Sequence, residues 1–184
     1  MQTHKKCFHV TSAALLFACS VLASAANAET FTASLTNVEL LIPQPMTPSC
    51  PQRGVLTGYG ESSLLGSSTA AATDCVTVLD NGATLKFDHG VMALSTAAKA
   101  PGNPKLPKDA GTIFLSYSGT FALTGMTATE LTYTMTSGTF TINGGTGKYA
   151  RATGGGSMSG QTIGNVNPTI PGKGNLKAEG LISY

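Results

Sequence analysis

Apolar residues alternate with Thr, Ser and Gly along most of this chain, at a period of two. The segment 112–123 shows the pattern best, because Ile113, Leu115, Tyr117, Phe121 and Leu123 all share one parity. Successive residues of a strand point to opposite faces of a sheet, so this alternation predicts strands with one buried face. Runs with the helical period are missing from the sequence.

Eight segments carry this strand pattern, with turn residues between them. They span 30–42, 54–65, 70–79, 83–95, 112–123, 130–143, 152–163 and 174–184. Eight antiparallel strands with few helices predict an all-β domain, namely an eight-stranded antiparallel β-barrel, with a β-sandwich as the alternative. A closed barrel has no exposed edge strand, which favours closure for so Thr-rich a sheet.

The connections between these segments also have sequence signals. Asp80-Asn81-Gly82 predicts a two-residue hairpin turn, because Asn-Gly tolerates the positive φ that such a turn needs. The stretches 43–51 and 97–110 are rich in proline and predict loops. In the segment 130–143 the apolar parity changes sides, which predicts a bulge near Ser137-Gly138.

The N-terminus predicts export. Lys5 and Lys6 precede a short apolar run at 10–22, and Ala26-Asn27-Ala28 is an A-x-A cleavage site. We therefore expect residues 1–28 to be a signal peptide cleaved before Glu29, and residues 29–184 to form one secreted or periplasmic domain. A lipoprotein signal at Cys19 is the alternative. The chain has no usable N-glycosylation site, since Pro168 blocks Asn167-Pro168-Thr169, and this fits a bacterial protein.

Removing the signal peptide changes the charge balance. Without Lys5 and Lys6, nine of the 11 basic residues remain against 9 acidic ones. A neutral domain without a basic cluster makes nucleic acid an unfavourable partner. Oligomeric state has no sequence signal here.

Two cysteines, Cys50 and Cys75, remain after cleavage. An even number of cysteines in an exported chain predicts a disulfide, with a redox or metal role as the alternative. His89 is the only histidine left in the mature chain, which is too few for a Cys/His metal site. We therefore expect neither a metal nor a cofactor.

The segment 138–160 (GTFTINGGTGKYARATGGGSMSG) resembles the motif region of allene-oxide-cyclase-like and dirigent-like barrel proteins. Small exported bacterial proteins of unassigned function share the same layout. The matching residues are Gly144, Gly145, Thr146, Gly147, Lys148, Tyr149, Ala150, Ala152, Gly154 and Gly156. The resemblance implies a barrel that binds and orients an apolar substrate for ring closure or coupling. It carries no catalytic residue over to this chain, because the family's acid and base positions lie outside the motif.

Within the motif, the glycines permit a tight connection, and Tyr149 is expected to anchor it against the barrel end. Arg151 stands where the family usually has a small residue. It is expected either on the surface or at the barrel mouth, where it would contact an anionic ligand.

Parity also selects candidate site residues. Glu39 shares parity with Phe31 and Leu35, whereas Glu61 shares it with Val55 and Tyr59. A carboxyl inside a barrel would have a raised pKa and act as proton donor or acceptor. A one-residue slip would instead turn Glu39 to water, because Val38, Leu40 and Ile42 have the other parity.

Aromatic residues complete the expected ligand-binding set. Tyr117 and Tyr133 lie on apolar parity and are expected in the core or the pocket lining, and Tyr59 is expected beside Glu61. Asp88 and His89 are adjacent in one strand, so we expect them on opposite faces and not as a catalytic pair.

Three functions fit this sequence. The first is a barrel that binds a small apolar ligand or is purely structural. The second is a cofactor-free cyclase or isomerase, which an open cavity facing Glu39 or Glu61 would favour; an interior filled by Phe, Leu and Met would favour the first. The third is an outer-membrane barrel, suggested by the C-terminal alternation of Leu176, Ala178, Ile182 and Tyr184. Against it, Trp is absent and aromatic residues are too few for two girdles, so no membrane insertion is expected.

Overall fold

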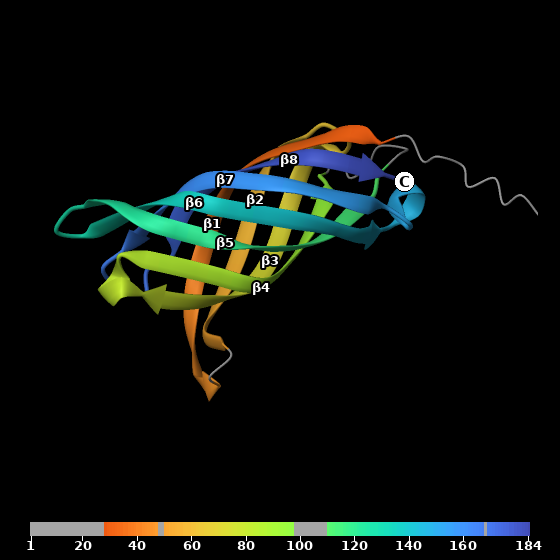
Figure 1. Ribbon diagram of the computed structural model, residues 1–184. Coiled ribbons are helices and arrows are strands. Elements are labelled where there is room, and N and C mark those ends of the chain that lie inside the picture. Colours follow the sequence, from red (N-terminus) through yellow and green to blue (C-terminus); the bar gives the residue numbers. More distant parts are fainter. Residues whose placement is uncertain (1–27, 48–49, 98–109, 168) are drawn as a thin grey trace, which may run out of the picture.

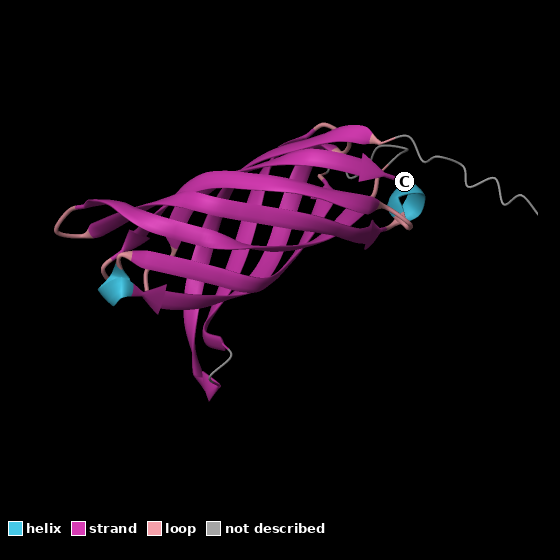
Figure 2. Cartoon of the chain, viewed as in Figure 1, coloured by secondary structure: helices cyan, strands magenta, loops and turns pink. Residues whose placement is uncertain are grey.

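The computed structural model describes residues 28–47, 50–97, 110–167 and 169–184 and shows a closed barrel of eight antiparallel strands (Figure 1). Strands make up nearly all of the described chain (Figure 2). They are β1 (Glu29–Thr47), β2 (Cys50–Ser62), β3 (Gly66–Leu79), β4 (Thr84–Thr96), β5 (Thr112–Met126), β6 (Glu130–Gly145), β7 (Thr153–Asn165) and β8 (Gly172–Ser183). The predicted barrel is confirmed, and the sandwich alternative is wrong.

Each strand pairs with the next along the chain, and the last pairs with the first. The seam between β1 and β8 runs from the pair Glu29–Ile182 to the pair Glu39–Gly172. The Tyr184 hydroxyl adds a hydrogen bond by donating to Glu29 Oε2 at 2.9 Å. The sheet therefore has no free edge, which removes the unpaired N–H and C=O groups of an open β-sheet.

All eight predicted segments are strands, but some connections differ from expectation. The stretch 43–51 is mostly strand and not loop, because β1–β2 pairing continues past the barrel body to Thr47 and Cys50. This hairpin projects from the barrel in Figure 1. The turn after β3 is longer than two residues, since Leu79 pairs with Thr84 across η1 (Asp80–Gly82). The positive φ expected there is present at Asp80, Asn81 and Gly82.

Two further structural predictions are confirmed. The pairing of β6 with β7 shifts register between Thr134 and Thr139, which places the predicted bulge. A disulfide joins Cys50 to Cys75, with the Cα atoms 5.1 Å apart. Residues 1–27 of the predicted signal peptide (1–28) and residues 98–109 of the predicted loop lie outside the described residues.

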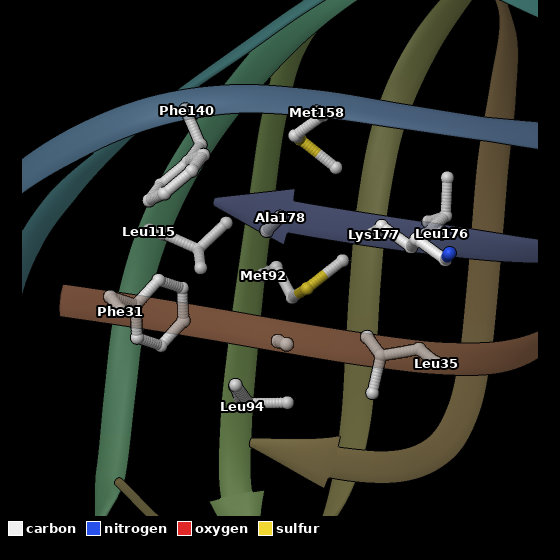
Figure 3. Close-up of a pocket in the computed structure, with 11 residues that line it drawn as sticks. Phe31, Leu35, Met92, Leu94, Leu115, Phe140, Met158, Leu176, Lys177 and Ala178 are labelled. Atoms are coloured by element: carbon white, nitrogen blue, oxygen red, sulfur yellow. The ribbon is translucent and has the colours of Figure 1, made fainter. Parts of the chain in front are cut away.

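One half of the barrel interior is filled by apolar side chains. Figure 3 shows side chains of β1, β4, β5, β6 and β7 facing one another there. Only a void of about 20 Å³ remains between them, which is too small for an organic ligand. The buried residues at its centre are Phe31, Leu35, Met92, Leu94, Leu115, Phe140 and Met158.

Tyr149 closes this end of the barrel. It ends the short helical turn η2 (Gly147–Tyr149) and is 0% exposed. Its hydroxyl donates to the backbone oxygen of Leu64 at 3.0 Å, and its ring lies edge-on to Tyr184 at 5.0 Å. Tyr149 therefore anchors the glycine-rich connection against the barrel end, as the sequence predicts.

Within the described part of the chain, no helix has the length and apolar character needed to cross a membrane.

Candidate functional site

The other half of the barrel holds a cavity of about 420 Å³. It reaches the end at which the β1–β2, β3–β4, β5–β6 and β7–β8 connections lie. Its walls are mainly apolar, with exposed Val78, Val166 and Ile170 among the residues that line it. The apolar wall also includes Leu41, Leu56, Val76, Leu85, Phe87, Phe121, Leu131, Met135 and Leu176.

Polar side chains from three strands meet on the inner side of this cavity. Glu39 comes from β1, Asp74 from β3 and Tyr117 from β5, and all three line the cavity. The Tyr117 hydroxyl donates to Asp74 Oδ2 at 2.7 Å. Asp74 and Tyr117 are buried, and Glu39 is half-buried because it borders the open space.

Gly54 of β2 lies between Glu39 and Asp74. A Cβ atom at Gly54 would overlap Asp74 Oδ1 and lie 2.7 Å from Glu39 Oε1. Both carboxyl groups therefore occupy the space that a side chain on β2 would take. The missing side chain lets an acid from β1 and an acid from β3 approach each other across the strand between them.

A bulge in β4 helps to place Tyr117. Thr73 pairs with Val91 but Cys75 pairs with Asp88, so two residues of β4 oppose Asp74. A Cβ atom at Gly90 would lie 2.7 Å from the Tyr117 ring. The glycine thus leaves room for the ring. Phe87 supports it from the side, with ring centroids 5.8 Å apart.

Burial dominates the electrostatics of this cluster. Removal from water, reinforced by the charge of Asp74, raises the pKa of Glu39 from 4.5 to about 8. Burial also raises the pKa of Asp74; the Tyr117 hydrogen bond opposes this rise and the charge of Asp88 adds to it. The pKa of Tyr117 is raised by burial and by the neighbouring acids. Glu39 is therefore protonated in a large fraction of molecules near neutral pH.

Several acceptor oxygens around the cavity have no hydrogen-bond partner in the part of the chain that the structure describes. Within the described residues, Asn37 Oδ1, Gln52 Oε1 and Asp74 Oδ1 are buried without a hydrogen bond. Asn37 is 4% exposed and Asp74 7% exposed, and all three residues line the cavity. Buried polar atoms are normally hydrogen-bonded, so these oxygens mark a place where a bound group would find acceptors.

The structure places three of the predicted site residues on this cavity. Glu39 faces it, so the slip that would send its carboxyl to water does not occur. Tyr117 and Tyr133 line it, and the Tyr133 hydroxyl donates to the backbone oxygen of Gly82 at 2.9 Å.

The prediction that Glu61 and Tyr59 face inward is wrong. Tyr59 is 68% exposed, and the exposed Glu61 accepts a hydrogen bond from Ser67 Oγ at 2.8 Å. The inner face of β2 carries Gly58 and Gly60 on either side of Tyr59, so the larger residues in this part of the strand are the outward ones. A prediction that takes the positions with larger apolar residues as the inward face therefore fails here.

Arg151 is exposed and follows η2 at the filled end of the barrel, so it is not at the cavity mouth. Asp88 and His89 do not point to opposite faces as expected. The bulge gives His89 a φ of 50°, and its Nε2 lies 3.9 Å from Asp88 Oδ1 on the outside.

Sequence reasoning missed Asp74, Asn37 and Gln52. The signal for Asp74 and Asn37 is parity: Asp74 alternates in step with Ala72 and Val76, and Asn37 with Leu35 and Glu39. Gln52 falls in the stretch expected to be a loop.

Comparison with known proteins gives no relative: no family model, curated protein or solved structure matches this chain. Among the described residues, no group of three or more His, Cys, Asp or Glu is placed to hold a metal ion.

Proposed function

We propose that this protein binds a small, largely apolar ligand inside the open half of its barrel. The observation that carries this proposal is the cavity of about 420 Å³, with apolar walls and a small polar cluster. Ligand pockets in proteins have this volume range and this mixture of surfaces. The filled half supports the cavity, because its close-packed side chains and Tyr149 hold the strands in place.

The outer face supports this proposal over the outer-membrane alternative. Outward positions of the described strands carry many Thr and Ser residues and charged residues such as Arg53, Lys86 and Glu179. Some apolar side chains, such as Val91 and Leu181, stand among them, but most of the large apolar side chains point inward. A transmembrane barrel has the opposite arrangement, with apolar side chains toward lipid.

We further propose that the protein acts in the periplasm or outside the cell. The Cys50–Cys75 disulfide supports this location, since such bonds persist in oxidising compartments. Kinship with allene-oxide-cyclase-like and dirigent-like barrels is part of the same proposal, and the closed eight-stranded barrel is the feature that supports it.

A dye-binding experiment with a filled cavity tests the binding function. Leu41 lines the cavity, so Leu41→Trp should weaken binding of the neutral dye N-phenyl-1-naphthylamine on the order of tenfold. Val91 is 56% exposed, so Val91→Trp adds the same side chain to a strand without filling the cavity and should bind as the wild type does. Equal binding by all three proteins would contradict the proposal.

A second candidate function is a cofactor-free isomerase. It is favoured by one observation, the half-buried Glu39 carboxyl whose pKa of about 8 lets it both accept and donate protons near neutral pH. Glu39 would take a proton from one carbon of the ligand and return it to another, so the net reaction needs no co-reactant.

Hydrogen exchange tests this second candidate. The α-hydrogens of 2-decanone should exchange with D₂O faster in the presence of the wild type than with Glu39→Gln, and the rate should rise with pH around 8. Dye binding should persist in both proteins. Equal exchange rates would remove the isomerase and leave the binding function standing.

A further inference from the structure

We propose that the polar cluster of the cavity binds the ammonium group of an apolar primary amine. This inference rests on the proposed function, because it identifies the class of ligand for the same cavity. It follows from which hydrogen-bonding groups the cluster presents and which charges surround it.

The groups that face this part of the cavity are mainly acceptors. Glu39 and Asp74 contribute carboxyl groups from β1 and β3, separated only by the space above Gly54. Asp74 uses Oδ2 for the Tyr117 hydrogen bond, and its buried Oδ1 has no protein partner in the described chain. A group that satisfies these oxygens must donate hydrogen bonds.

Two amide side chains add further acceptors. Asn37 and Gln52 line the same cavity, and their Oδ1 and Oε1 atoms are buried without a hydrogen bond to any described residue. Asn37 is more than nine-tenths buried. An ammonium group has three N–H donors and no acceptor, so its chemistry matches a cluster of carboxyl and amide oxygens.

The charge around the cluster also selects a cation. No Lys, Arg or His occurs among the described residues that line the cavity. The groups facing Glu39 are Asp74 and Tyr117, and Asp88 acts on Asp74 from β4. Asp88 is itself paired outside the cavity, with Lys86 at 2.9 Å and His89 at 3.9 Å, and neither of these residues lines the cavity. Among the described lining residues, Glu39 and Asp74 therefore face no cation. An anionic head group would lie beside two acids with no described cation to balance its charge, whereas a cation would stabilise both ionised acids.

The walls determine the rest of the ligand. The cavity volume of about 420 Å³ is far larger than a lone ion needs, and most of the lining is apolar. An alkyl or aromatic body of roughly ten carbons fits such a space. The ligand is therefore a cationic amphiphile, with its charged end toward Glu39 and its apolar body toward the mouth near Val78 and Ile170.

Binding of a cation also has a proton signature. Below pH 8 the Glu39 carboxyl is largely protonated in the free protein, and it loses this proton when an ammonium group binds beside it. Affinity for the amine should therefore rise between pH 6 and pH 9. Titration in two buffers with different ionisation enthalpies should show proton release at pH 7.

Three ligands of equal chain length test the proposal: octylamine, 1-octanol and octanoate, each used to displace N-phenyl-1-naphthylamine from the full mature chain. Octylamine should bind on the order of tenfold more tightly than 1-octanol, and octanoate most weakly. Glu39→Gln should abolish this preference, with each displacement compared with the dye affinity measured for that variant. Glu61→Gln, which neutralises an exposed carboxyl on the outside of β2, should keep the preference.

The outcomes separate this inference from the function on which it rests. If the dye binds but the amine shows no advantage over the alcohol, the ammonium site is wrong and the binding function stands. If neither the dye nor any octyl compound binds, the binding function itself fails. Thermal stabilisation by calcium chloride alone, lost in Glu39→Gln, would assign the cluster to a metal ion and overturn the ammonium site.

Discussion

At the scale of single residues, the central feature of this barrel is a pair of acids inside it, beside the cavity. Glu39 and Asp74 share the space left by Gly54, and among the described residues only Tyr117 donates a hydrogen bond to either carboxyl. Burying a carboxyl without a nearby cation favours its protonated form. The cluster is thus a site at which stability and proton uptake are linked.

This linkage predicts how stability varies with pH. Glu39 has a folded-state pKa of about 8, above its ordinary value of 4.5, so the folded state binds the proton more tightly than the unfolded state does. The free energy of unfolding should fall as pH rises from 4.5 to 8 and level off above 8, by about 5 kcal/mol in total.

Urea unfolding at several pH values measures this effect. Glu39→Gln should remove most of this decrease in the free energy of unfolding. The raised pKa of Asp74 should account for the decrease that remains. Glu61→Gln should follow the wild-type curve. Parallel curves for the wild type and Glu39→Gln would show that Glu39 does not carry the linkage.

The Tyr117 hydrogen bond gives a second residue-scale prediction. Tyr117→Phe leaves the buried Asp74 carboxyl without its donor and should lower the free energy of unfolding by about 1–3 kcal/mol. Tyr133→Phe removes a bond to the backbone oxygen of Gly82 in a turn, where water can replace it, and should cost less. A larger loss for Tyr133→Phe would contradict this assignment.

At the scale of elements, β2 shows how glycine lets neighbouring strands approach closely. A Cβ atom at Gly60 would overlap the backbone oxygen of Ser34 and lie 2.9 Å from Leu35 Cα. These are backbone atoms of β1, which cannot move aside as a flexible side chain would. The inner face of β2 therefore depends on glycine for its packing against β1.

Gly60→Ala should accordingly destabilise the barrel by about 1–3 kcal/mol. Gly164→Ala is the matched control, because a Cβ atom at Gly164 meets nothing within 4 Å. It should change the free energy of unfolding by less than about 0.5 kcal/mol. Similar losses for the two variants in urea unfolding would remove close strand approach as the explanation.

The same glycines explain which parts of the molecule the sequence predicts. On β5 the inner residues are large, so alternation reveals both the strand and its buried face through Ile113, Leu115 and Tyr117. Near Tyr59 and Glu61 the inner residues of β2 are the small Gly58, Gly60 and Ser62, and Tyr59 and Glu61 are assigned to the wrong side. Alternation therefore predicts where strands lie more reliably than it predicts which face is inside.

The candidate site is harder to predict for a related reason. Glu39 is recognisable because large apolar residues share its parity, but Asp74 shares parity with the small residues Ala70 and Ala72. The proximity of Asp74 to Glu39 depends on how β1 and β3 are each paired with β2, and a single sequence does not specify that register.

The disulfide belongs to the element scale as well. Cys50 begins β2 and Cys75 lies near the end of β3, at a sequence separation of 25. Replacing both by Ser should lower the free energy of unfolding by about 3.5 kcal/mol, because the unfolded chain regains its loop entropy. Circular dichroism should retain the β-sheet spectrum, and an unchanged unfolding midpoint would contradict a stabilising role.

At the scale of the whole molecule, the barrel divides into a filled half and an open half. Phe31, Ile113 and Ile182 are fully buried in the filled half, and Tyr149 closes it. The open half keeps a cavity of about 420 Å³ whose only described charged lining groups are Glu39 and Asp74. We therefore expect a ligand to contact side chains in the open half of the interior and to leave the side chains of the filled half unchanged.

Methyl NMR during titration with 1-octanol tests this central claim most directly. Resonances of Leu41, Val76 and Leu131, which line the cavity, should shift in a saturable way, while those of Leu94, Ile113 and Ile182 in the filled half stay in place. Saturable shifts confined to outward methyl groups such as Val91 and Leu181, or no saturable shifts, would contradict a ligand site inside the barrel.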